Sequence, residues 1–163
     1  MTQYQPYPGG AAMPPMAQPD PPPSILNAVK CMYAGAVLSG LSLIVGLISI
    51  SAIKSAIRTA LPNASAATIN SDMRAAVVDI VLSGAIGIGL WLWMAAMNRR
   101  GRNWARILST IFFALDTLGV LLGFGQHTPV LTKLLSILVW LAGLGAMIFM
   151  WQAVSTAYYK GAR

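Results

Sequence analysis

Four apolar segments, each about twenty residues long, constrain the fold more than any other feature of the sequence. They cover approximately residues 32–53, 77–97, 107–124 and 134–153. An α-helix rises about 1.5 Å per residue, so a segment of this length spans the roughly 30 Å hydrocarbon layer of a bilayer. Only 9% of the residues are charged, whereas about a quarter are charged in a soluble domain. We therefore expect an all-α membrane protein, a bundle of four transmembrane helices.

The connections between the spans differ in length. Leu61-Pro62-Asn63 should end helical structure after the first span, because proline disfavours helix at and before its own position. A short, moderately polar stretch at 64–74 follows, and Ser65 is its expected helix N-cap. Spans two and three are joined by an arginine-rich turn at 98–106. This connection predicts a tight helical hairpin.

Residues 1–24 differ in composition from the rest of the chain. Eight of the ten prolines lie within residues 1–23, together with Gln, Gly and two tyrosines. Such a segment buries too little apolar surface to offset its ordering entropy, so we predict a disordered Pro-rich tail. The tail is either a solvated tether or a ligand for a proline-reading partner, since Pro19-Asp20-Pro21-Pro22 matches PxxP. Residues 25–163 would form the membrane domain.

The basic residues predict the orientation of the bundle. Four spans place the amino terminus, the arginine-rich turn and the carboxyl terminus on the same side. That side holds seven of the eleven basic residues, and the other holds four: Lys30, Arg99, Arg100, Arg102, Arg106, Lys160 and Arg163 against Lys54, Arg58, Arg74 and Lys133. Cytoplasmic loops carry the excess of Lys and Arg, so both termini are expected in the cytoplasm. Because the basic residues flank apolar segments, we expect contact with anionic lipid headgroups, above all by Arg99, Arg100, Arg102 and Arg106, and no nucleic-acid binding.

Small residues recur four positions apart within the spans. The pairs are Gly35 with Ser39, Ala36 with Gly40, Ser42 with Gly46, Ser83 with Gly87, and Ala142 with Ala146. Helices in lipid associate through close backbone approach, which small side chains permit. We expect these positions to pack the four helices together. The alternative is self-association of the chain into a homo-oligomer through the first span.

Asp116 is the most informative single residue, because it lies near the middle of the third span. A charge at that depth costs about 2.5–3.5 kcal/mol on insertion scales, so Asp116 should face the bundle interior. Ser39 and Ser42 of the first span lie at a similar depth, with Gly87 of the second span allowing close approach. One interpretation is a structural hydrogen bond from Asp116 to Ser42 or Ser39. The other is a site that handles protons or cations, or one that lines the lumen of an oligomer.

Signatures of catalysis and metal binding are missing from the sequence. It contains no HExxH, no GxSxG, no phosphate-binding glycine loop and no Cys/His cluster. Cys31 and His127 are each the only residue of their type, and a lone histidine makes no metal site. Asp79 is expected near the outer end of the second span as an interfacial charge, within reach of Arg74 or Lys133. We expect neither an enzyme nor a cofactor.

Three segments resemble small uncharacterised four-span integral membrane proteins of actinobacteria. They are residues 28–36 (AVKCMYAGA), 91–95 (WLWMA) and 98–108 (NRRGRNWARIL), which follow a Pro-rich tail. The arginine-rich turn is the most specific of them. The resemblance implies four spans in a bacterial plasma membrane and carries no site residues.

Two functions follow from these features. The first is a non-enzymatic scaffold or accessory subunit of a membrane assembly, which meets a membrane-protein or cytoplasmic partner through residues 1–23. The alternative is a small transporter or oligomeric channel subunit that uses the intramembrane Asp116.

Overall fold

The computed structural model describes residues 20–123 and 129–161, which form six α-helices and no strand. They are α1 (Pro23–Ile48), α2 (Ile50–Ala60), α3 (Ala66–Arg99), α4 (Asn103–Gly123), α5 (Val130–Met150) and α6 (Ala153–Gly161). Four of them, α1, α3, α4 and α5, are long and apolar enough to cross a membrane. The predicted all-α bundle of four transmembrane helices is confirmed. Most of the Pro-rich tail, residues 1–19, lies outside the described residues, and helix already begins at Pro23.

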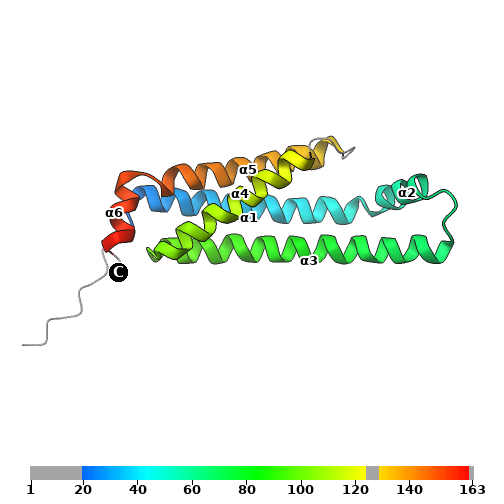
Figure 1. The fold of residues 1–163 in the computed structure, drawn as a ribbon, viewed down its shortest axis with the longest axis horizontal. Coiled ribbons are helices and arrows are strands. Elements are labelled where there is room, and N and C mark those ends of the chain that lie inside the picture. Colours follow the sequence, from blue (N-terminus) through cyan, green and yellow to red (C-terminus); the bar gives the residue numbers. More distant parts are fainter. Residues whose placement is uncertain (1–19, 124–128, 162–163) are drawn as a thin grey trace, which may run out of the picture.

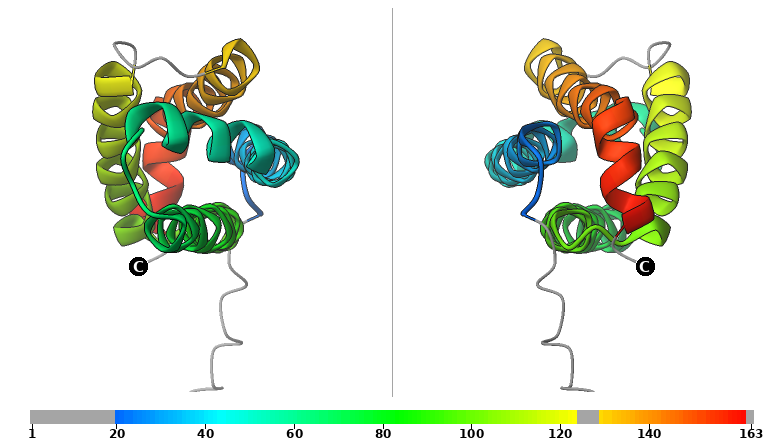
Figure 2. Two further views of the ribbon diagram at one scale, coloured as in Figure 1. Left: turned by 90° about the vertical axis from the view of Figure 1, so that its right-hand side faces the viewer. Right: turned by 90° about the vertical axis from the view of Figure 1, so that its left-hand side faces the viewer.

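The helix α1 packs along both α3 and α5, and these three helices run side by side (Figure 1). By contrast, α4 crosses the bundle obliquely, from the end of α3 to the beginning of α5 (Figure 1). Seen along the bundle, the four long helices surround a central region, and α6 and α2 lie across opposite ends of it (Figure 2). The start of α1, the α3–α4 turn and α6 share one end, here named the α6 end; the opposite end is the α2 end (Figure 1).

The first apolar segment is divided into two helices at Ser49. The expected span ran to residue 53, but α1 ends at Ile48 and α2 begins at Ile50. Polar and charged side chains become frequent there, including Ser51, Lys54 and Arg58, and α2 buries none of its residues. A helix with such a polar face is more stable outside the hydrocarbon layer than inside it. We therefore attribute the end of α1 at Ile48 to the polar residues that follow.

The helix α3 is longer than a membrane crossing requires. Its 34 residues extend over about 51 Å at the usual helical rise, against roughly 30 Å of hydrocarbon. The polar stretch at 64–74 was expected to be a separate short element, but its residues from Ala66 onward continue directly into the span. The predicted N-cap is confirmed, because the Ser65 hydroxyl accepts a hydrogen bond from the Thr68 amide.

The arginine-rich turn is short because α3 ends in a Schellman motif. The amide of Arg102 donates to the Met97 carbonyl and the amide of Gly101 donates to the Asn98 carbonyl. Gly101 has a φ of 67°, a left-handed conformation that costs little without a Cβ. The chain then enters α4 at Asn103, so the hairpin predicted from the sequence is present.

Glycines admit large side chains from neighbouring helices. A Cβ added at Gly35 would lie 2.8 Å from the Trp91 ring, and one added at Gly143 would lie 2.9 Å from the Phe113 ring. The outward faces carry exposed apolar side chains, as lipid contact requires. The tightest core gathers toward the α6 end, and its members come mainly from α1, α3 and α5: Ile25, Ala28, Val29, Met32, Met94, Ala95, Ala146, Met150 and Tyr159.

Candidate functional site: an intramembrane carboxylate between two cavities

A buried polar network closes the α6 end of the bundle. Asn98, with no exposed surface, donates from Nδ2 to the Met94 carbonyl at 2.9 Å and to the Ser109 hydroxyl at 3.0 Å. Its Oδ1 accepts a 2.8 Å hydrogen bond from the hydroxyl of Tyr159. The network therefore joins α3, α4 and α6 through one fully satisfied amide.

Two further contacts hold α6 in place. The Ser155 and Ser24 hydroxyls are hydrogen-bonded at 2.8 Å, and the Tyr158 hydroxyl donates to the Arg99 carbonyl at 3.0 Å. These bonds reach the start of α1 and the end of α3 from a helix of only nine residues. The α6 end is thus closed by specific polar contacts.

The four arginines expected at lipid headgroups are in two different environments. Arg99, Arg100 and Arg102 are exposed, in agreement with headgroup contact, whereas Arg106 is only 6% exposed. The Arg106 guanidinium lies 3.7 Å from the centre of the Trp151 ring and donates to the Thr156 hydroxyl. Arg106 is therefore part of the closure at this end, which its place in a charge cluster did not indicate.

The other half of the bundle contains a cavity of about 640 Å³ whose wall is mostly apolar but carries several hydroxyl groups, and it is named here the polar cavity. Its wall extends from the middle of the bundle to the α2 end, where Lys133 and Pro129 lie. Six hydroxyl side chains face it: Ser39, Ser42, Ser49, Ser83, Thr132 and Ser136. Hydroxyl groups on the wall of such a cavity can hydrogen-bond water, so this cavity can be hydrated within the span.

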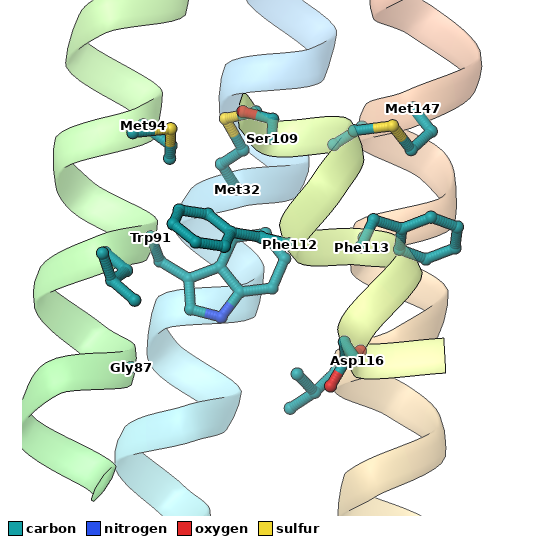
Figure 3. Close-up of a pocket in the computed structure, with 13 residues that line it drawn as sticks. Met32, Gly87, Trp91, Met94, Ser109, Phe112, Phe113, Asp116 and Met147 are labelled. Carbon is teal, nitrogen blue, oxygen red and sulfur yellow. The ribbon is translucent and has the colours of Figure 1, made fainter. Parts of the chain in front are cut away.

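A smaller apolar cavity of about 240 Å³ lies between the polar cavity and the α6 end. Figure 3 shows Trp91 and Phe112 pointing into it, with Met94 nearer the α6 end and Gly87 nearer the α2 end. Met32 and Met147 complete the soft, polarisable part of the wall.

Asp116 lines both cavities, and Figure 3 shows it on the wall of the apolar one. Ser39 and Ser42, the serines placed beside it by the sequence, lie on the wall of the same polar cavity. The hydrogen bond considered between them is not formed, because Ser42 donates to the Leu38 carbonyl. Within residues 20–123 and 129–161, no hydrogen bond or ion pair reaches the Asp116 carboxylate. The structure thus brings the three residues to one cavity, on whose wall the Asp116 side chain is exposed rather than buried.

Gly87 lies at the junction of the cavities, on the wall of both. A Cβ added there would meet no atom within 4 Å, so Gly87 leaves open space and does not serve a close helix contact. The sequence did not identify Trp91, Phe112 or the methionines as site residues, because apolar side chains of a span carry no signal of which face borders a cavity.

The remaining candidates lie apart from the cavities or outside the described residues. Asp79 is exposed on α3 and forms no ion pair with Arg74 or Lys133 among the described residues. His127 falls in 124–128, outside the described residues. No three His, Cys, Asp or Glu side chains gather in the described part of the chain in a way that could hold a metal ion.

The arrangement offers one type of chemistry at mid-bundle. A single carboxylate can exchange a proton or a bound cation with a hydroxyl-lined cavity on one side and an apolar cavity on the other. Comparison with models of protein families, with curated proteins and with solved structures finds no match for this chain.

Proposed function

We propose that this multi-pass membrane protein is a small transporter that moves protons and binds them at Asp116. The observation that carries the proposal is the position of Asp116 on the wall of both cavities, without a partner among the described residues. A carboxylate within a span is costly, and such residues typically mark ion or substrate pathways. A purely structural Asp116 would be expected to bond to Ser42 or Ser39.

The proposal includes an orientation in a bacterial plasma membrane, with the α6 end in the cytoplasm. Its support is the excess of basic residues at that end, where Arg99, Arg100 and Arg102 are exposed. In this orientation the polar cavity opens outward, and the Asn98–Tyr159 network closes the cytoplasmic side. Access from one side at a time distinguishes a transporter from an open pore.

The scaffold or accessory role stays a prediction. It depends on the Pro-rich tail, and residues 1–19 are outside the described part of the chain. Self-association is likewise a prediction, which the mass of the detergent-solubilised protein would test.

Proton movement into proteoliposomes tests the proposed function. Purified protein is reconstituted around a pH-sensitive dye, and a potassium gradient with valinomycin drives protons inward. We expect acidification with the unmodified chain and background rates with Asp116→Asn. Asp79→Asn is the matched control, because it makes the same chemical change on a residue that is exposed like Asp116 but borders neither cavity. Equal rates for the unmodified chain and Asp116→Asn, with both folded, would contradict the proposal.

A further inference from the structure

The apolar cavity has features that movement of a bare proton does not need. Its wall combines the rings of Trp91, Phe112 and Phe113 with methionine side chains, around about 240 Å³ of space. A proton-binding carboxylate requires only water access, and the hydroxyl groups of the polar cavity already suit that need. The aromatic wall therefore indicates a ligand that has an apolar part, which a proton lacks.

We propose that the apolar cavity binds a small lipophilic organic monocation, with its positive group at Asp116 and its apolar body beside Trp91 and Phe112. This inference rests on the proposed function, because it assigns a ligand class to the same carboxylate.

The charges on the two walls select a cation. Among the residues that the structure describes, Asp116 is the only charged one that lines the apolar cavity, and it is acidic. Lys133 lines the polar cavity and does not border the apolar cavity. Lys133 lies six positions before Val139, which borders both cavities as Asp116 does, so the Lys133 backbone is about 9 Å nearer the start of α5 at the usual helical rise. An anion in the apolar cavity would meet the carboxylate with no compensating positive charge.

The remaining wall suits the body of such a cation. The rings of Trp91 and Phe112 offer flat apolar surface on which an aromatic ligand body can stack. Methionine side chains adapt to apolar ligands of differing shape because they are flexible and polarisable. Together with one carboxylate, these groups favour a ligand that is positively charged and hydrophobic. They offer few hydrogen-bond partners, so the ligand needs few polar groups.

The volume limits the size of the ligand. An engineered apolar cavity of about 150 Å³ holds one benzene molecule. The present cavity, at about 240 Å³, has room for one aromatic ring and a small ammonium group. The ligand would pass from the polar cavity along Gly87, where the wall carries no side chain.

Calorimetric titration of the full chain in detergent with benzyltrimethylammonium tests the inference. Neopentylbenzene, which has the same shape without the charge, is the ligand control. We expect the cation to bind, and Asp116→Asn to weaken binding at least about tenfold, a loss of about 1.4 kcal/mol. Gly87→Leu should weaken binding similarly by filling the junction, while Gly89→Leu should not, since Gly89 also has open space but borders neither cavity.

The outcomes separate this inference from the proposed function. Absence of benzyltrimethylammonium binding, or equal binding by the unmodified chain and Asp116→Asn, would overturn the ligand class. The proposed function would still stand if Asp116→Asn abolished proton movement in proteoliposomes. Conversely, Asp116-dependent binding without proton movement would support the cation site and contradict proton transport. Preference for neopentylbenzene would also overturn the inference, because the carboxylate would then contribute nothing.

Discussion

The hydroxyl of Tyr159 lies 2.8 Å from Oδ1 of Asn98 and donates a hydrogen bond to it, although 61 residues separate the two along the chain. Both side chains are almost completely buried, at 1% and 0% exposure. This contact joins the last helix to the end of α3, and through Ser109 to α4. Closure of the α6 end therefore depends on a few polar groups that have no access to water.

Tyr159→Phe should destabilise the bundle more than Tyr158→Phe. The first change leaves Asn98 Oδ1 buried without a donor, which costs about 1–3 kcal/mol. The second removes a bond to the Arg99 carbonyl at an exposed position, where water can replace the lost donor. Thermal unfolding of both variants in the same detergent measures the difference. Equal losses of melting temperature would show that removing the hydrogen bond to Asn98 destabilises the bundle no more than removing the one to Arg99.

Alkaline pH should weaken the closure through the same tyrosine. Burial raises the pKa of Tyr159, and the nearby Arg106 offsets this only in part. A raised pKa means that the folded state holds the proton more tightly than the unfolded state. The resulting stability is complete below the unperturbed tyrosine pKa of about 10 and is lost as pH rises through the folded value. The melting temperature of the unmodified chain should fall more steeply above about pH 10 than that of Tyr159→Phe; parallel curves would contradict this.

Gly35→Ala should destabilise the packing of α1 against α3. The added Cβ would lie 2.8 Å from the Trp91 ring, which itself lies against Gly143 on α5. Overpacking of this kind costs about 1–3 kcal/mol. Gly89→Ala is the control, because a Cβ there meets nothing within 4 Å. Unfolding in detergent should show a loss for the first variant only, and an unaffected Gly35→Ala would mean that Trp91 moves freely.

The four-span architecture was predictable because it depends on the length of apolar segments and on local signals. Ser65 and Gly101 act through backbone groups within a few residues, so their roles follow from nearby sequence. Hydropathy also reports depth along the membrane normal. Counting residues therefore put Ser42 at the level of Asp116, and the structure places both on the wall of the polar cavity.

Other features depend on which helix faces which, and hydropathy does not contain that information. The oblique course of α4, the burial of Arg106 and the Asn98–Tyr159 bond all arise from contacts between distant segments. The division at Ser49 was missed because Ile50, Ala52 and Ile53 continue the apolar segment in composition. The cavity wall was missed because a lipid-facing and a cavity-facing Phe112 look alike in sequence.

Arg106→Lys should destabilise the α6 end more than Arg102→Lys. The guanidinium of Arg106 stacks 3.7 Å from the Trp151 ring centre and bonds to Thr156, and a lysine ammonium reproduces neither geometry. A desolvated cation–π contact contributes about 2 kcal/mol. Arg102 is exposed, so the same exchange there should change stability by less than about 0.5 kcal/mol. Equal effects in thermal unfolding would indicate that the ring contact contributes little.

Cysteine labelling in intact cells tests the orientation. In a Cys31→Ala background, Asn63→Cys reports the α2 end and Arg102→Cys reports the α6 end, since both side chains are exposed. With the basic-rich α6 end in the cytoplasm, a membrane-impermeant maleimide should label Asn63→Cys directly and Arg102→Cys only after permeabilisation. The opposite pattern would reverse the bundle. The polar cavity would then open to the cytoplasm, and ligands would reach Asp116 from inside the cell.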